Sequence, residues 1–151
     1  MKKIILLCIA ATSSMTVNAQ WFGSENVKGN GNVITVERST ENYDAVGVAG
    51  FFDVELIAGT EGKITITAEE NLIPHIETEV KNGELQIKTE KGYNLSTSRR
   101  NSILIIVPFE SLDAVSLAGS GDVVLRGSTG DFECALSGSG DISAKQLKAK
   151  N

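Results

Sequence analysis

The chain has very little cysteine and histidine, with two cysteines and one histidine among its 151 residues. Cys8 lies in an N-terminal segment that is predicted below to be removed, so the mature chain keeps only Cys134. One thiol excludes an internal disulfide and with it a disulfide-stabilised scaffold. The sequence also lacks a His/Cys/Asp cluster and a nucleophile elbow around any serine. We therefore assign no catalytic, cofactor-binding or metal-ligating residue and expect no cofactor, and the residues that bind a partner stay unknown.

A membrane-spanning hydrophobic run is absent as well. Residues 1–19 carry the parts of a signal peptide: a positive start, an apolar core at residues 4–11 and a small-residue cleavage site at residues 17–19. Cleavage there makes Gln20 the first mature residue. The apolar core is too short to cross a bilayer interior of about 30 Å. Only four apolar residues precede Cys8, fewer than the roughly 7–15 of an h-region, so lipidation there is a minor alternative. We expect export to the periplasm, the outer-membrane surface or the medium, with no integral membrane span.

Positive charge is scarce in the mature chain, which has 12 Lys and Arg residues against 19 Asp and Glu residues, a formal balance of −7. This balance argues against non-specific nucleic-acid binding, because such affinity comes largely from contacts between basic side chains and phosphates. The 132 mature residues suffice for one domain with a hydrophobic core, and no linker divides them. We expect a single domain over residues 20–151.

Most of the chain alternates apolar and polar residues with a period of two, which is the pattern of half-buried β-strands. In one segment Phe52, Val54 and Leu56 share a face, and Asn82-Gly83 is a two-residue hairpin signal. The strands are predicted at residues 33–36, 52–56, 63–68, 76–80, 84–88, 103–107, 115–117, 123–125, 132–136 and 142–144. The sequence therefore predicts an all-β fold whose N-terminal part contains a β-hairpin.

Three segments depart from that alternation. Residues 103–107 form a continuous aliphatic run, predicted as a strand that is buried on both faces and ends at Pro108. Residues 69–75 are predicted to hold a single helical turn before Pro74. Residues 91–100 are predicted as one long polar loop.

A nine-residue phrase occurs twice in the C-terminal half. Residues 117–125 are LAGSGDVVL and residues 136–144 are LSGSGDISA, an offset of 19 residues, and a fainter copy lies at residues 49–54. A fixed period near 20 built from short strands is typical of a solenoid. We therefore predict a parallel β-helix-like solenoid with coils of about 19 residues in the C-terminal half.

Each residue type of the repeat has an expected place in such a coil. Glycines suit turns that need positive φ or a crowded backbone, and the two aspartates are expected to accept hydrogen bonds from neighbouring turn amides. The aliphatic residues are expected to fill the interior. The residues concerned are Gly119, Gly121, Gly138 and Gly140 for the turns, Asp122 and Asp141 for the hydrogen bonds, and Leu117, Val123, Leu136 and Ile142 for the interior.

The order of these phrases resembles a known family. The pieces that carry the resemblance are residues 29–33 (GNGNV), 51–56 (FFDVEL), 82–87 (NGELQI) and the two Gly-Ser-Gly-Asp copies, which together cover nearly all of residues 27–147. The set is similar to the head domain of putative auto-transporter adhesins, often called the GIN domain. The resemblance implies a parallel, β-helix-like fold and a surface or envelope location. It brings no agreed catalytic or ligand-binding residues.

The chain departs from that family at its end. Family members usually continue through further Gly-Ser-Gly-Asp coils, whereas this sequence stops at Lys150-Asn151 shortly after the second copy. We therefore keep truncation of the domain at its C-terminus as an alternative, and we expect an unpaired β edge there.

Several residues have an alternative interpretation. Asp122 and Asp141 would lie about 5 Å apart on neighbouring coils, close enough for a weak calcium site or a catalytic carboxylate pair, but turn capping is favoured. Cys134 is expected to be a small buried residue on one face with Phe132 and Leu136, rather than a reactive thiol.

The remaining candidates lie outside the repeat. His75 is expected to be a partly exposed turn residue. The loop that carries Lys91, Tyr93, Arg99 and Arg100 is expected to be solvated, with contact to an acidic glycan or a membrane surface as the alternative. The sequence does not decide whether the aromatic residues Trp21 and Phe22 cap the core.

These observations favour an exported, non-enzymatic surface or envelope binding module of adhesin-head type, with an extracellular glycan or protein as its partner. The alternative is a structural envelope protein that forms a homo-oligomer through the open C-terminal β edge. A carbohydrate-active enzyme is the least favoured interpretation.

Overall fold

The computed structural model describes residues 23–127 and 130–145. The predicted signal peptide over residues 1–19, with Cys8, lies outside the described residues, as do Trp21, Phe22 and the last residues of the chain. Within the described part, no helix has the length and apolar character needed to span a membrane.

The described residues form strands and one short 3₁₀ turn, η1 (Ile73–His75), which confirms the all-β prediction. The strands are β1 (Glu25–Lys28), β2 (Val33–Ser39), β3 (Ala45–Gly50), β4 (Asp53–Ala58), β5 (Lys63–Glu69), β6 (Ile76–Lys81), β7 (Glu84–Thr89), β8 (Tyr93–Ser96), β9 (Leu104–Phe109), β10 (Ala114–Gly119), β11 (Val123–Arg126), β12 (Glu133–Gly138) and β13 (Ile142–Lys145).

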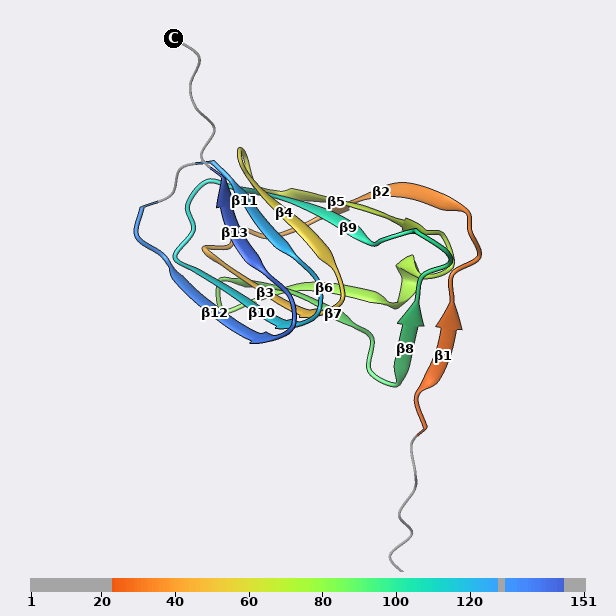
Figure 1. The fold of residues 1–151 in the computed structure, drawn as a ribbon. Helices are drawn as coiled ribbons and strands as arrows, with labels where there is room; N and C mark the ends of the chain where they lie inside the picture. Colours follow the sequence, from red (N-terminus) through yellow and green to blue (C-terminus); the bar gives the residue numbers. More distant parts are fainter. Residues whose placement is uncertain (1–22, 128–129, 146–151) are drawn as a thin grey trace, which may run out of the picture.

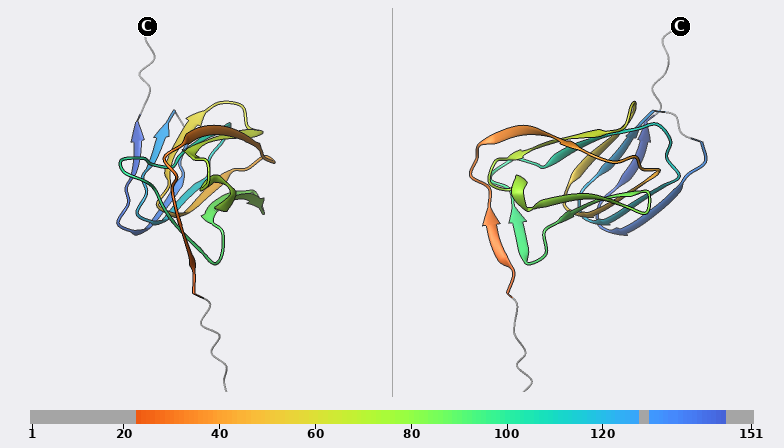
Figure 2. Two further views of the ribbon diagram at one scale, coloured as in Figure 1. Left: turned by 90° about the vertical axis from the view of Figure 1, so that its right-hand side faces the viewer. Right: turned by 180° about the vertical axis from the view of Figure 1, so that it is seen from behind.

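Two sheets face each other across the core (Figures 1 and 2). One has the order β12-β10-β3-β7-β6 and the other the order β13-β11-β4-β9-β5-β2. A separate two-stranded sheet of β1 and β8 stands at one end of the molecule, at the lower right of Figure 1. The inward side chains of the two large sheets form one hydrophobic cluster. The predicted inward face of Phe52, Val54 and Leu56 is confirmed, because all three are buried.

Parallel strands dominate the centre of both sheets. They are stacked in levels, each made of one strand from the five-stranded sheet and one from the six-stranded sheet. β3 and β4 lie between the pair β7/β9 on one side and the pair β10/β11 on the other, and β12/β13 follow β10/β11. The stacking order therefore differs from the chain order, since β7 and β9 come later in the sequence than β3 and β4. Antiparallel strands β6, β5 and β2 complete the sheets at the β7/β9 end.

The repeat sets the register between the last levels. Val115 pairs with Cys134 and Val123 with Ile142, so each residue lies beside the one 19 positions later. The fainter upstream copy takes part as well, because Gly119 pairs with both Gly50 and Gly138.

The hairpin prediction is confirmed at Asn82-Gly83. Strands β6 and β7 pair antiparallel across this two-residue turn. Both turn residues have positive φ, 51° at Asn82 and 79° at Gly83, as a type I′ turn requires.

The prediction for the aliphatic run at residues 103–107 was wrong in two respects. Strand β9 alternates between fully and partly buried residues rather than being buried on both faces, and it continues through Pro108 to Phe109. Pro108 is tolerated because β9 pairs with β5 only as far as Ile106, so the missing N–H interrupts no ladder on that side.

Two further expectations need correction. The helical turn does not end before Pro74, because Pro74 is the second residue of η1. A proline is tolerated there, since the first turn of a helix needs no intrahelical N–H donor. The segment between Glu90 and Asn101 is not one loop, since β8 lies in its middle and pairs in parallel with β1. The partner strand is 68 positions away in sequence (Glu25 with Tyr93), a distance that local alternation does not reveal.

Candidate functional site

The Gly-Ser-Gly-Asp turns bring successive levels into backbone contact. A β-carbon added at Gly119 would lie 2.0 Å from the carbonyl oxygen of Gly50, and one added at Gly138 would lie 2.1 Å from that of Gly119. Gly119 and Gly138 also have positive φ, 139° and 127°. Glycine is thus required at these corners for both space and conformation, as the sequence predicted.

The aspartates of the repeat form a ladder of backbone caps. The backbone N–H of Asp141 donates to Oδ1 of Asp122 at 3.2 Å, and the N–H of Asp122 donates to Oδ1 of Asp53 at 3.4 Å. Asp122 therefore caps the next level, as predicted, and the same role for Asp141 stays a prediction. Among residues 23–127 and 130–145 there is no group of three or more His, Cys, Asp or Glu residues placed to hold a metal ion.

An open groove of about 540 Å³ lies between β8 and the ends of β3 and β7. Phe51, just after β3, and Tyr93, at the start of β8, line it with their side chains partly exposed. Lys88 of β7 and Lys91 of the turn before β8 contribute positive charge, and Asn94 contributes an amide. We call this the aromatic groove.

A smaller trough of about 190 Å³ continues from the aromatic groove along the outer face of the five-stranded sheet. The two hollows share Ala49 and Lys88. The floor of the trough is low because Gly47 and Ala118 carry little or no side chain, and Gln86 is among the polar residues that line it.

Each aromatic ring of the groove packs against a second ring. The ring of Phe51 stacks on that of buried Phe52 with a centroid separation of 5.7 Å. The ring of Tyr93 lies 4.1 Å from that of His75, whose Nδ1 is hydrogen-bonded to Glu90 at 2.7 Å. His75 is partly exposed and lies in a turn, as predicted, but its two partners were not apparent from the sequence.

The two lysines differ in their surroundings. Lys88 is 3.3 Å from a carboxylate oxygen of Glu77 on β6. Lys91 is exposed and makes no ion pair with any residue that the structure describes. The groove thus presents an uncompensated positive charge beside two aromatic rings.

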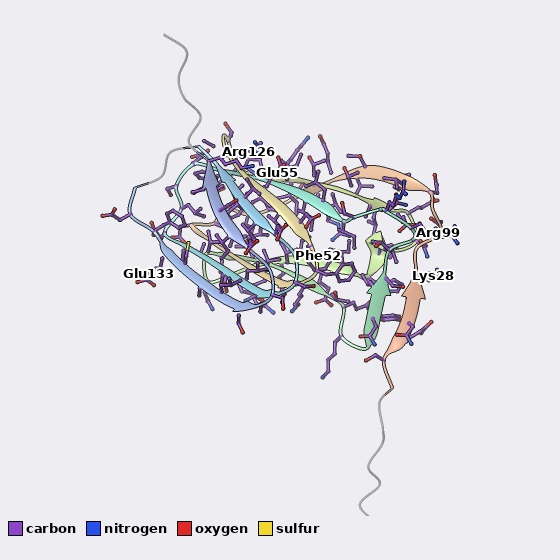
Figure 3. All side chains as sticks on the ribbon, in the orientation of Figure 1. Lys28, Phe52, Glu55, Arg99, Arg126 and Glu133 are labelled. Atoms are coloured by element: carbon purple, nitrogen blue, oxygen red, sulfur yellow. The ribbon has the colours of Figure 1, made fainter. Side chains whose placement is uncertain are left out.

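The structure separates the basic residues that the sequence grouped together. Lys91 and Tyr93 lie at the start of β8, whereas Arg99 and Arg100 follow its other end and are not groove residues. Figure 3 shows Arg99 at the same end of the molecule as Lys28 and far from Glu133.

The segment after β8 is fixed by a buried carboxylate. Glu69 is fully buried and accepts hydrogen bonds from the backbone N–H groups of Gly31 at 2.6 Å and Ser98 at 2.8 Å. Burial by itself raises the pKa of the Glu69 carboxyl, but these bonds, with those from the Ser98 hydroxyl and Asn101, outweigh it and lower the pKa. Glu69 is therefore a structural anchor for this segment.

Burial of the last strands differs from the prediction. Cys134 is a free, exposed cysteine, and the side chain of Leu136 is 51% exposed. Their side chains do lie on the face that continues from buried Val115 and Leu117. They are exposed because, within the described part of the chain, β12 and β13 are the outermost strands of their sheets.

Sequence reasoning missed Phe51 and Lys88 as groove residues. The available signal was the Phe51-Phe52 pair: alternation places Phe52 inside, so Phe51 must point outward, and an outward aromatic ring next to polar residues is a common feature of binding surfaces. The contribution of Lys88 depends on the position of β8 beside the end of β7, which no local pattern indicates.

Comparisons with solved structures find similar folds. The chain aligns with a "putative adhesin" from Parabacteroides merdae at 19% identity and a TM-score of 0.62, covering 80% of this chain and 59% of that one. A "putative lipid binding protein" from Parabacteroides distasonis aligns at 24% identity and a TM-score of 0.60, covering 82% and 62%. A "putative adhesin" from Bacteroides fragilis aligns at 19% identity and a TM-score of 0.62, covering 80% and 58%. The chain thus spans about three fifths of the length of these relatives.

No match is found among curated proteins. A family model, described as "Putative auto-transporter adhesin, head GIN domain", matches residues 42–151. This range includes β3 to β13 and both copies of the Gly-Ser-Gly-Asp turn. The resemblance noted from the sequence is confirmed, and the protein belongs to this GIN-domain family of putative auto-transporter adhesin heads.

Proposed function

We propose that this protein is an exported, non-enzymatic binding module of adhesin-head type whose partner is an extracellular glycan or protein. The observation that carries the proposal is the aromatic groove with its continuation over the outer face of the five-stranded sheet. A concave surface with partly exposed aromatic rings and a few polar groups is typical of ligand-binding sites. Membership of the adhesin-head family agrees with this proposal and with a location at the cell envelope.

The proposal includes a β-helix-like architecture for the C-terminal half. Strand pairs β10/β11 and β12/β13 would be successive coils of about 19 residues. The parallel register of Val115 with Cys134 and of Val123 with Ile142 supports this description. Such a stack repeats its outward side chains in ladders, for example Ala49, Ala118 and Ser137, and so builds a flat face next to the groove.

We propose that residues 1–19 direct export and are then removed by cleavage after Ala19. N-terminal sequencing of the protein recovered from the periplasm, the outer membrane or the medium tests this step. Material that begins at Gln20 is the expected result, whereas cytoplasmic retention of the full chain would contradict export.

The binding function is tested with the mature chain on a glycan array and in a cell-binding assay run in parallel. We expect signal in at least one of the two, above that of a β-rich protein of similar size and charge. A clean negative across both assays would remove the binding proposal.

A second candidate function is a structural envelope protein that self-associates through β12 and β13. It is favoured by the exposed side chains of Leu136 and Cys134 at that edge, since an unpaired strand edge is a template for pairing with another chain. Light scattering on residues 20–151 distinguishes the two candidates: a strict monomer excludes end-to-end pairing and leaves the binding module unaffected.

An enzyme built on Asp122 and Asp141 is the least supported function. The carboxylate of Asp122 accepts a hydrogen bond from the backbone N–H of Asp141, and both residues are exposed, whereas the pKa of a catalytic acid is commonly raised by burial. If glycan turnover is detected, an Asp122→Asn/Asp141→Asn variant that retains it excludes these two residues.

A further inference from the structure

We propose that the aromatic groove binds a saccharide that carries carboxylate groups, with the sugar on Phe51 and Tyr93 and its carboxylate at Lys91. This inference rests on the proposed binding function and adds the chemical class of the ligand. It is carried by three features of the groove: supported rings, an unpaired lysine and a low floor.

The two rings are held in place before any ligand arrives. Phe51 stacks on Phe52, which is completely buried, and Tyr93 packs against His75, which Glu90 holds by a hydrogen bond. Because the rings are already ordered, binding sacrifices little side-chain entropy. Two supported rings at the rim of an open groove suit the flat apolar face of a pyranose.

The charge of the groove selects an acidic sugar over a neutral one. The mature chain has a formal balance of −7, yet the groove contains Lys91 without an ion-pair partner in the described residues. Lys88 also lines the groove and forms an ion pair with Glu77 at 3.3 Å. A ligand carboxylate at Lys91 would gain a charge-assisted hydrogen bond, and the gain would decrease as salt increases.

The shape of the site favours an extended chain of sugars. The trough that leads away from the groove is floored by Gly47, Ala49 and Ala118, and Gln86, Ser116 and the carboxylate of Glu84 line it. Because the Glu84 carboxylate accepts hydrogen bonds from hydroxyl groups and repels a carboxylate, the trough suits sugar hydroxyls and the acidic group belongs at Lys91. A β-carbon on Gly47 would lie 2.6 Å from Oε1 of Glu84, so this glycine keeps the floor low. A low floor with polar residues along it suits the hydroxyl groups of an oligosaccharide.

A lipid acyl chain fits this site less well. Among the described residues, the large hydrophobic side chains that are exposed are Val33 and Leu136, and neither lines the groove or the trough. The apolar lining of the groove comes mainly from the two rings and from small residues such as Ala49 and Gly50, and Lys88, Lys91 and Asn94 share the lining with them. A saccharide uses both kinds of group, whereas an acyl chain uses only the apolar ones.

The experiment is calorimetric titration of residues 20–151 with a panel of acidic saccharides: oligogalacturonate, oligoalginate, hyaluronan oligomers and oligosialic acid. Fully methyl-esterified oligogalacturonate, a neutral match for the first probe, and anionic phospholipid vesicles are the comparison ligands. We expect binding to at least one acidic saccharide, weakening with salt, and much weaker binding to the ester and the vesicles.

Variants locate the binding. Lys91→Gln, at an exposed position, is expected to weaken binding about two- to five-fold, the equivalent of one exposed charge pair. Phe51→Ala is expected to weaken it at least about five-fold. Lys63→Gln is the matched control, since Lys63 is an exposed lysine on β5 that pairs with Glu37 away from the groove, and it is expected to leave the affinity unchanged.

Four results would overturn the inference: no binding to any acidic saccharide, equal binding to the methyl ester, a Lys91→Gln variant that binds like the wild type, or preferential binding to the vesicles. Any of these results together with a positive glycan array or cell-binding assay would leave the proposed binding function standing, so the two failures are distinguishable.

Discussion

At the residue scale, Glu69 shows how one buried charge can organise a large part of the surface. It is the buried charged side chain of the described residues, and it joins the turn before β2 to the segment after β8. Gly29 leaves room for it, because a β-carbon there would lie 2.0 Å from Oε2 of Glu69. A carboxylate that accepts several backbone hydrogen bonds is stabilised in its charged form without a basic partner.

Replacement of this carboxylate is expected to destabilise the fold. Glu69→Gln would place an amide N–H₂ among N–H donors, leaving at least one buried donor unsatisfied, and should lower the free energy of unfolding by roughly 1–3 kcal/mol. Urea denaturation at neutral pH measures this change. Glu70→Gln, at the exposed next position, is the control and should be close to neutral. Equal stability of both variants would show that Glu69 is not an anchor.

The same carboxylate predicts a pH dependence. The folded pKa of Glu69 is lowered, so its contribution is complete above the ordinary glutamate pKa of about 4.3 and is lost as the pH falls through the folded pKa. The difference in Tm between the wild type and Glu69→Gln should therefore shrink as the pH is lowered from 6 towards 2. A difference that stays constant over this range would contradict the assignment.

The capping role of Asp122 predicts indifference to calcium. Its Oδ1 already accepts the N–H of Asp141, and the described residues contain no cluster of three or more ligating side chains. The Tm measured by calorimetry should be unchanged between millimolar calcium and millimolar EDTA. A clear rise with calcium, abolished in Asp122→Asn, would show that the ladder is a metal site.

At the scale of elements, the turns between strands could be predicted well and the burial of the strands less well. The Asn82-Gly83 hairpin and the 19-residue register follow from local residues, because positive φ and close backbone contact demand glycine or asparagine. Alternation also placed Cys134 and Leu136 on the correct face of β12. It could not show that they are exposed, because burial depends on what packs beyond the strand, and that information is not local.

The repeat glycines predict that substitutions at two adjacent positions, Gly121 and Ser120, affect stability very differently. A β-carbon at Gly121 would lie 1.9 Å from the carbonyl oxygen of Phe52, so Gly121→Ala must push two levels apart, at a cost of roughly 1–3 kcal/mol or more. Ser120→Ala, at the exposed position beside it, should stay within about 0.5 kcal/mol of the wild type. Thermal unfolding of the two variants compares them directly. Similar unfolding temperatures would mean that the levels are not in backbone contact at this turn.

The exposure of β12 predicts a reactive thiol. Cys134 is exposed and is the one cysteine of residues 20–151, so a thiol reagent such as Ellman's reagent should modify the folded protein at a rate comparable to that in denaturant. Protection of the thiol in a monomeric sample would contradict the exposed edge, and protection in an oligomeric sample would indicate that the edge is covered by another copy.

At the scale of the whole molecule, the order of levels and the position of the aromatic groove were beyond prediction. The levels interleave, since β7 and β9 lie on the far side of β3 and β4 from β10 and β11. The groove is lined by residues from β8, which pairs with β1, and from the ends of β3 and β7. Both features depend on contacts between distant segments, whereas the all-β class and the family follow from local patterns and their order.

The most direct test of the binding function is a glycan array probed with the mature wild-type chain and with its Phe51→Ala/Lys91→Gln variant, with Leu136→Ser as a control at the opposite edge. The account predicts wild-type signal on carboxylate-bearing saccharides, loss of that signal in the groove variant and retention in Leu136→Ser. Equal signal from the wild type and the groove variant, or no wild-type signal on any glycan together with no binding to cells, would contradict it.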